Sequence, residues 1–122
     1  WRPGATKLDW RSKGLDAEDA KVVAYVVATS GSLVNLYLNH NQIGNEGAKA
    51  LAAGIASSGS MATLVLANCG IGDEGAKALA EAVRSSGSMA TLYLGGNSRI
   101  GDAAKQSLRA AVQGRQGFGL YL

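Results

Sequence analysis

One stretch of the sequence has the outline of a phosphate-binding loop. After the apolar run Thr63–Leu66, residues 70–75 have the spacing G-x-G-x-x-G and lead into an alanine-rich segment. In a dinucleotide site such glycines let the backbone approach a pyrophosphate, and an acidic residue about 20 positions later binds the ribose. No acidic residue lies between Glu81 and Asp102. The glycines therefore predict a tight turn before a helix, and no bound cofactor.

The only cysteine and the only histidine are the other candidates for chemistry. Cys69 follows an apolar strand, where it is either a reactive thiol or a structural residue. We favour a structural ladder in which Asn41, Cys69 and Asn97 satisfy backbone groups of successive turns. His40 would need a nucleophile or a carboxylate as partner. The residues in the same column of the other repeats are Ser12, Asn68 and Gly96, which do not provide a catalytic partner for His40. We therefore expect no catalytic residue, no metal and no enzyme activity.

The composition describes a chain that can bury a core and lacks a strongly charged patch. Of its 122 residues, 47% are hydrophobic and 17% are charged, and the net charge is +3. Lys and Arg are dispersed, which argues against a nucleic-acid or membrane surface. No apolar stretch reaches the roughly 18 residues of a membrane span. A single cysteine predicts an intracellular, cytoplasmic protein. The sequence starts at Trp1 rather than Met, so organelle import stays open.

The chain consists of an internal repeat, which is the strongest signal in the sequence. Two segments of 28 residues are followed by a third of 29, which has one extra residue in the range 96–100. A degenerate copy precedes them and the start of another follows. We expect one domain, residues 1–122, made of a degenerate repeat or cap, three full repeats and a truncated one, with boundaries 1–29, 30–57, 58–85, 86–114 and 115–122.

Each repeat predicts a short strand and then a helix. Leucines alternate with other residues in Thr63–Leu66, as in a strand with one buried face. Apolar residues then recur at helical spacing. We expect Asn45, Asp73 and Asp102 to cap their helices, and the glycine in Ser86-Gly87-Ser88 to end one. Because one repeat cannot bury its apolar face alone, stacking should give a parallel sheet on one side and helices on the other.

These repeats resemble the leucine-rich repeat family. The core L-x-L-x-x-N/C recurs three times, and the following Ile-Gly-(Asn/Asp)-Glu-Gly-Ala-Lys-Ala-Leu and the 28/29-residue spacing are similar to the ribonuclease-inhibitor-like subclass. The resemblance implies an α/β solenoid, a short horseshoe arc with a parallel sheet on its concave face and helices on its convex face. The matching triplets are Leu36-Leu38-Asn41, Leu64-Leu66-Cys69 and Leu92-Leu94-Asn97.

Two lysines depart from the family pattern. Lys13 occupies the place of the ladder Asn or Cys, which predicts that the first unit is a cap or a degenerate repeat. Lys105 occupies the place of the inward-facing alanines Ala48 and Ala76. We therefore expect the last helix to be shifted or frayed.

The residue between the two strand leucines faces away from the core and forms a column along the stack. Neighbouring strands lie about 4.8 Å apart, so three tyrosines should fall on one concave strip. Tyrosine near Asn and Arg is typical of protein interfaces. Tyrosine is also common in β-strands that bind no partner, because its side chain suits strand geometry. Both interpretations stay open. The predicted partner-binding residues are Asp9, Arg11, Asn35, Tyr37, Asn39, His40, Val65, Tyr93 and Tyr121.

The predicted function is that of a non-enzymatic interaction module or scaffold. It would bind a protein partner through the concave sheet face, with no nucleic acid and no membrane insertion. One alternative is a structural subunit or fragment within a larger assembly, because the last strand has an open edge. Another is a GTPase-activating protein resembling the Ran GTPase activator, for which Arg99 is the one candidate loop arginine.

Overall fold

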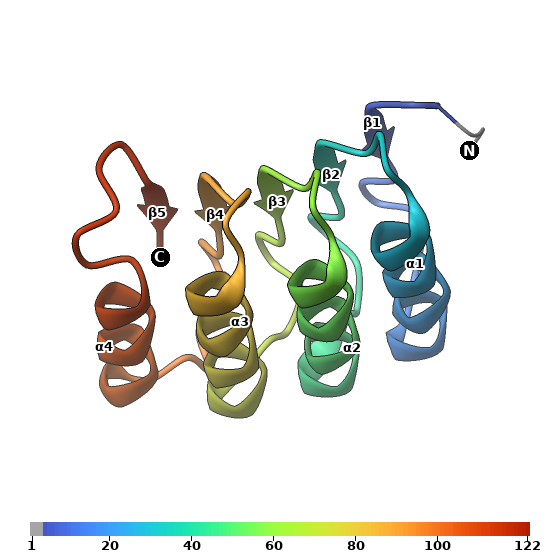
Figure 1. The fold of residues 1–122 in the computed structure, drawn as a ribbon. Coiled ribbons are helices and arrows are strands. Elements are labelled where there is room, and N and C mark those ends of the chain that lie inside the picture. The colour runs from blue at the N-terminus through green and yellow to red at the C-terminus, as the bar shows by residue number, and fades with distance from the viewer. Residues whose placement is uncertain (1–3) are drawn as a thin grey trace.

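Strands and helices alternate along the whole described chain. The structure is a computed structural model that describes residues 4–122, so the first three residues of the predicted unit 1–29 lie outside the described residues. Figure 1 shows the row of helices below the row of strands. The strands are β1 (Lys7–Asp9), β2 (Asn35–Tyr37), β3 (Thr63–Val65), β4 (Thr91–Tyr93) and β5 (Gly119–Tyr121). The helices are α1 (Ala17–Thr29), α2 (Gly44–Ser57), α3 (Asp73–Ser85) and α4 (Asp102–Ala111).

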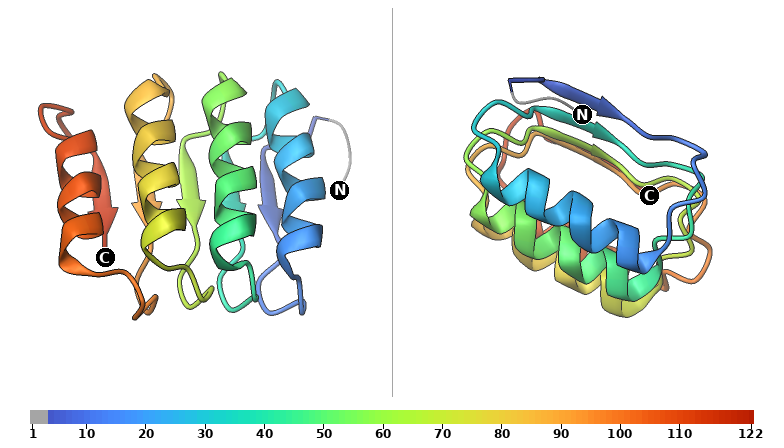
Figure 2. Two further views of the ribbon diagram at one scale, coloured as in Figure 1. Left: turned by 90° about the horizontal axis from the view of Figure 1, so that it is seen from below. Right: turned by 90° about the vertical axis from the view of Figure 1, so that its right-hand side faces the viewer.

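The five strands form one parallel sheet in chain order. Each strand pairs with its neighbour so that equivalent residues of successive repeats are directly side by side, as in Leu36 with Leu64 and Leu64 with Leu92. The helices form a second layer on one side of this sheet (Figure 2). They are spaced more widely than the strands, so the sheet lines the inner side of a short arc (Figure 1). The α/β solenoid predicted from the repeat is confirmed.

The core lies between the two layers and is continuous from unit to unit. The strand leucines Leu36, Leu64 and Leu92 have no exposed surface, and neither do the helix residues Leu51 and Leu79. Because each unit covers the flank of the next, the apolar area buried per unit depends on its neighbours.

Glycines let the helices approach closely on the side where they touch. A Cβ atom on Gly54 of α2 would lie 2.7 Å from the backbone oxygen of Ala24 in α1. A Cβ on Gly75 of α3 would lie 2.9 Å from the Cβ of Ala48 in α2. Real Cβ atoms do not approach other atoms this closely, so larger residues would push the helices apart. Gly75, the third glycine of the phosphate-loop pattern, therefore serves helix packing.

Residues at the starts of α2 and α3 cap the following helix rather than their own. The prediction that Asn45 and Asp73 cap their own helices is wrong, because both lie inside the helices. The Oδ1 of Asn45 accepts hydrogen bonds from the backbone N–H groups of Gly72 and Gly75, each at 2.9 Å. The Oδ1 of Asp73 accepts the N–H of Gly101, before α4, at 2.7 Å. Helix capping thus links neighbouring units.

A serine in extended conformation follows each of the first three helices. The predicted glycine stop is wrong, because the C-cap of α3 is Ser86, with φ −87° and ψ 125°. The hydroxyl of Ser88 donates to the carbonyl of Met61 in the preceding unit at 2.7 Å. In the last unit the guanidinium of Arg115 takes over this role. It donates to the carbonyls of Val83, Ser86 and Met89.

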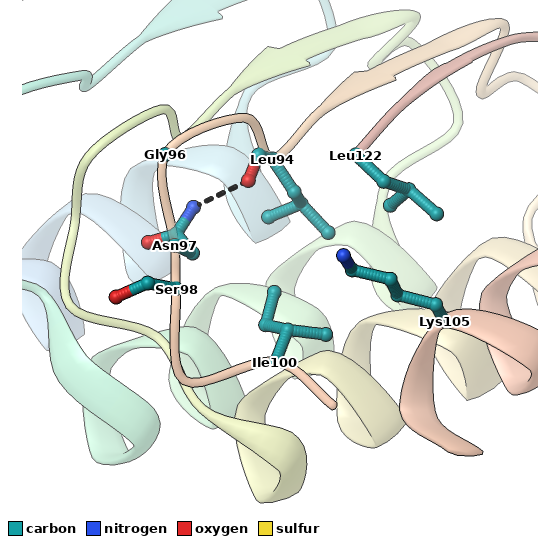
Figure 3. A pocket seen from close by; sticks show the side chains of 7 residues that line it. All are labelled: Leu94, Gly96, Asn97, Ser98, Ile100, Lys105 and Leu122. Carbon is teal, nitrogen blue, oxygen red and sulfur yellow. Dashed lines mark hydrogen bonds between the residues drawn. The ribbon is translucent and has the colours of Figure 1, made fainter. Parts of the chain in front are cut away.

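The last helix is shorter than the others but continuous. Its 10 residues compare with 13 in α1 and α3 and 14 in α2. Asp102, the predicted cap, is its first helical residue, and Gly101 is the N-cap. The predicted fraying at Lys105 is wrong, because the helix is continuous through this residue. The lysine is half-buried, and its side chain lies over the end of the core beside Leu94, Ile100 and Leu122 (Figure 3). It therefore does not disrupt α4.

The close contact at Gly54 should make this position intolerant of a methyl group. We expect Gly54→Ala to destabilise the protein by about 1–2 kcal/mol, since overpacking against backbone outweighs the gain in helix propensity of about 1 kcal/mol. Gly59→Ala is the matched control, because a Cβ there meets nothing within 4 Å and φ is not positive. Urea unfolding followed by circular dichroism measures both. A Gly54→Ala protein as stable as the Gly59→Ala protein would contradict the packing argument.

Candidate functional site

The bend after each strand is held by a buried polar side chain. The Oδ1 of Asn97 accepts the backbone N–H groups of Cys69 and Ile71 at 2.9 and 3.1 Å. Its Nδ2 donates to the carbonyls of Leu66 and Leu94 at 2.9 and 2.8 Å. One carboxamide thus satisfies four backbone groups in two successive units. Asn41 makes the equivalent bonds, with Lys13, Leu15, Trp10 and Leu38.

Cys69 lies in the same column with its thiol inside the structure. Its Sγ donates to the carbonyl of Leu38 at 3.2 Å and lies 3.5 Å from that of Ala67. The residue has no exposed surface, and burial raises the pKa of the Cys69 thiol. A protonated, inaccessible thiol is a poor nucleophile. The structure thus places Asn41, Cys69 and Asn97 at equivalent turns.

Removing the Asn97 carboxamide should be costly because its partners are buried. We expect Asn97→Ala to lower the free energy of unfolding by about 2–4 kcal/mol, since two N–H groups and two carbonyls lose their partner inside the protein. Gln113→Ala, at an exposed site, is the control and should change stability little. Urea denaturation with a fixed m-value tests this. Equal midpoints for the two variants would show that the ladder does not carry the stability.

The thiol should stay unreactive until the protein unfolds. We expect Ellman's reagent at neutral pH to label Cys69 only slowly in the native protein, because the thiol is buried and its pKa is raised. Labelling should become fast across the same urea concentrations that unfold the chain. Stopped-flow absorbance measures both rates. Rapid labelling in the native state would restore Cys69 as a chemical candidate.

The glycines of the phosphate-loop pattern each meet a structural requirement. Gly70 has φ 67°, in the left-handed region that glycine adopts without strain. Gly72 donates its N–H to Asn45, and Gly75 lies against Ala48. Within residues 4–122 no three His, Cys, Asp or Glu side chains are grouped so that they could hold a metal ion.

His40 lies on the exposed bend just past β2. Its backbone has φ 63°, and the equivalent Ser12 and Asn68 have φ 53° and 54°. Left-handed backbone is uncommon for residues other than glycine, so the bend holds this conformation in three successive units. The side chain is exposed. His40 thus lies beside the sheet face, where it lines the hollow described below.

The strand register brings the predicted column together. Asp9, Tyr37, Val65, Tyr93 and Tyr121 occupy one register position across the five strands. They lie on the sheet face opposite the helices, because the flanking leucines point into the core. We call these five residues the concave strip. Asn35, also predicted to bind a partner, lies half-buried beside the strip at the start of β2.

The half of the concave strip formed by Asp9 and Tyr37 is charged, through Asp9 itself and the neighbouring Lys7 and Arg11. The guanidinium of Arg11 makes two hydrogen bonds to the carboxylate of Asp9, at 2.7 and 2.6 Å. The hydrogen bonds from Arg11 hold the pKa of the Asp9 carboxyl below its usual value. The ammonium of Lys7 lies 5.2 Å from the centre of the Tyr37 ring, and the Arg11 guanidinium lies 6.0 Å from it. Tyr37 is therefore flanked by two cations.

The other half of the strip is aromatic. Tyr93 and Tyr121 stack with ring centres 5.2 Å apart and an interplanar angle of 25°. A Cβ atom on Gly95 would lie 2.9 Å from Cε1 of Tyr93, and one on Gly119 would lie 3.1 Å from Cε2 of Tyr121. The glycines therefore let both rings lie against the sheet. The two residues remain 41% and 52% exposed, so the stacked rings form an exposed aromatic surface.

An open hollow of about 420 Å³ lies between the charged and aromatic halves. Asn39 lines it and has its Oδ1 buried without a hydrogen-bond partner among the described residues. Because this oxygen is buried, a group in the hollow would reach it only after the Asn39 side chain moved. The hollow is lined by Asn39, His40, Val65, Ala67, Asn68, Tyr93, Gly95 and Gly96. The predicted partner-binding residues include only four of these eight. The other four, Ala67, Asn68, Gly95 and Gly96, occupy the two positions after Leu66 and Leu94.

Comparisons with known proteins agree with this architecture. Residues 32–52 and 60–80 each match a family model described as leucine-rich repeat. A solved structure, Leiomodin-1 Actin-Binding Site 2 (ABS2), superposes with a TM-score of 0.87 over 98% of this chain and 72% of that chain, at 14% sequence identity. No curated protein sequence matches the chain. The chain thus has the leucine-rich repeat fold, and the ribonuclease-inhibitor-like subclass stays a prediction. Among residues 4–122, every helix is too short or too polar to span a lipid bilayer.

Proposed function

We propose that residues 1–122 act as one protein-binding module that holds a protein partner on the concave face of the sheet, without chemistry of its own. The observation that carries this proposal is the concave strip with its adjoining hollow. It combines exposed tyrosine side chains with polar residues that line the hollow, among them Asn39 and His40. Aromatic rings and a few directional polar groups are the features that dominate binding energy at protein interfaces.

The strip is pre-organised for binding. The Tyr93 and Tyr121 rings support each other, so they lose little freedom when a partner covers them. The ion pair of Asp9 and Arg11 fixes the charged half near Tyr37. A partner that suits both halves would place apolar groups over the stacked rings and polar or charged groups near Asp9 and Arg11.

A purified candidate partner is suggested by the fold neighbour. The matched leiomodin domain is titled an actin-binding site, so actin is the first protein to test directly. At 14% identity the likeness supports a shared fold only. Which partner the protein binds would depend on the side chains of the concave strip. The alternative of a subunit within a larger assembly remains, and it would use the ends of the solenoid rather than the strip.

A GTPase-activating role has weaker support. It would depend on Arg99, whose backbone pairs with Gly72 and whose side chain is exposed in the loop before α4. An exposed arginine alone does not define a site for transition-state stabilisation.

Removing the strip tyrosines should abolish partner binding and leave the fold intact. We expect Tyr37→Ala with Tyr93→Ala to weaken binding at least about 100-fold, because truncating an interface tyrosine commonly costs about 2 kcal/mol or more. Partners are captured with the wild-type protein, identified by mass spectrometry, and purified. Their dissociation constants, and that of actin, are then measured by interferometry.

Tyr25→Ala is the matched control, because Tyr25 is 70% exposed on α1, away from the strip. It should leave the dissociation constants unchanged. Circular dichroism melts should show that all variants unfold near the wild-type temperature. Partners that bind the double variant as tightly as the wild type would remove the concave strip as the binding site.

A further inference from the structure

The two faces of the solenoid differ in their carboxylates. Of the nine Asp and Glu residues, only Asp9 lies on a strand, and the others lie in helices or at the N-cap of α1. The half of the concave strip at β1 and β2 holds Asp9 together with two cations, Lys7 and Arg11. This part of the concave face therefore has an excess of positive charge, which favours an acidic partner.

The two cations beside Tyr37 keep N–H groups that no described residue uses. The ammonium of Lys7 lies 5.2 Å from the centre of the Tyr37 ring, so it reaches over β2 and away from the outer edge of β1. It makes no ion pair within residues 4–122. Arg11 uses its Nε and Nη2 for Asp9, which leaves its Nη1 for another acceptor. Charged donors of this kind bind a carboxylate well.

The spacing along the strip favours one conformation of a bound segment. Tyr37 and Tyr93 lie two strands apart, which is about 9.6 Å at about 4.8 Å per strand. In a polyproline II helix, side chains three residues apart project from the same face at a distance of about 9.3 Å. A β-strand places side chains of one face about 6.6 or about 13 Å apart. It therefore does not reach both tyrosines.

The hollow between the two tyrosines also suits a polyproline II segment. Such a segment has no internal hydrogen bonds, so its carbonyls need donors. His40 and Asn68 line the hollow with exposed side chains that can donate to these carbonyls. An α-helix covers a similar distance, about 10.5 Å, in seven residues. Its backbone groups are bonded internally, however, and would leave His40 and Asn68 without a partner.

We propose that the concave strip binds a polyproline II segment of its protein partner in which an acidic residue and a proline are three positions apart. This inference rests on the proposed function and adds the chemistry of the partner. The carboxylate pairs with Lys7 beside Tyr37, and the proline ring lies on Tyr93, which Tyr121 supports by stacking. Aromatic side chains are the surfaces on which such segments commonly dock.

Seven-residue peptides test this chemistry directly. The probe has glutamate at its centre and proline at the other six positions, so that a proline lies three positions away in either chain direction. One matched peptide has glutamine at its centre, and another has serine at both ends. We expect the probe to bind the wild-type protein about fivefold more tightly than either matched peptide, as an exposed ion pair and one aromatic contact allow. NMR titration of the protein's amide signals measures the dissociation constants, and about 0.5 M NaCl should remove only the preference for glutamate over glutamine.

Two variants of the protein assign each preference to a residue. Lys7→Gln should bind the glutamate and glutamine peptides equally, and Tyr93→Ala should bind the proline-ended and serine-ended peptides equally. Lys77→Gln, at an exposed lysine of α3, is the matched control and should behave as wild type. The amide spectra of the free variants show whether each one is folded.

Equal binding of all three peptides to the wild-type protein, or no shifted signals at millimolar peptide, would overturn the proposal. So would tighter binding of a stapled helix with glutamate and leucine seven residues apart. These results differ from a failure of the proposed function. If captured partners lose binding to the Tyr37→Ala, Tyr93→Ala protein while the peptides show no preference, the strip is the binding site and the polyproline II inference is wrong. If captured partners bind that protein unchanged, the proposed function fails and this inference fails with it.

Discussion

The fold depends on one constraint, which is that each unit must satisfy the buried polar groups of the next. The carboxamide of Asn97 shows this most directly, because it bonds backbone groups on both sides of the boundary between two units. The side chains of Asn45, Asp73 and Ser88 also reach across unit boundaries. Buried backbone groups without partners are expensive, so a unit separated from its neighbour loses hydrogen bonds as well as apolar contacts.

This constraint leaves the concave face free for function. The scaffold uses the strand leucines, the ladder residues and the small residues between helices. None of these requires a particular side chain in the concave strip. The strict register nevertheless brings one residue from each strand into line. A change such as Val65 in place of tyrosine alters the surface presented to a partner without altering a scaffold contact.

Much of this arrangement could be predicted from the repeat, because a spacing of 28 residues fixes which positions are equivalent. The parallel sheet, the register of Tyr37 with Val65 and the common turn position of Asn97 all follow from alignment alone. The capping residues could not be assigned in this way, since Asn45 and Asp73 have the residue types of caps but serve the following helix. Local sequence gives no sign of which helix a cap serves.

Features that depend on side-chain conformation could not be predicted from the sequence either. The stacking of Tyr93 on Tyr121 requires both rings to lie against glycine backbone, and the sequence shows only that glycine follows or precedes each tyrosine. The buried Oδ1 of Asn39 depends equally on one rotamer. Arg115 is a third case, because an arginine in a turn gives no indication that it will replace the serine that bonds the preceding carbonyls.

The two ends of the described solenoid meet the same constraint in different ways. At its start, α1 supplies its own cap: Asp16 accepts the N–H of Asp19, and Asp19 accepts the N–H of Asp16, each at 3.0 Å. This capping box makes α1 independent of any preceding helix. The start of α4 has no such cap of its own, because the N–H of Gly101 donates to Asp73 of the preceding unit. The first helix is therefore capped within its own unit, whereas α4 depends on its neighbour.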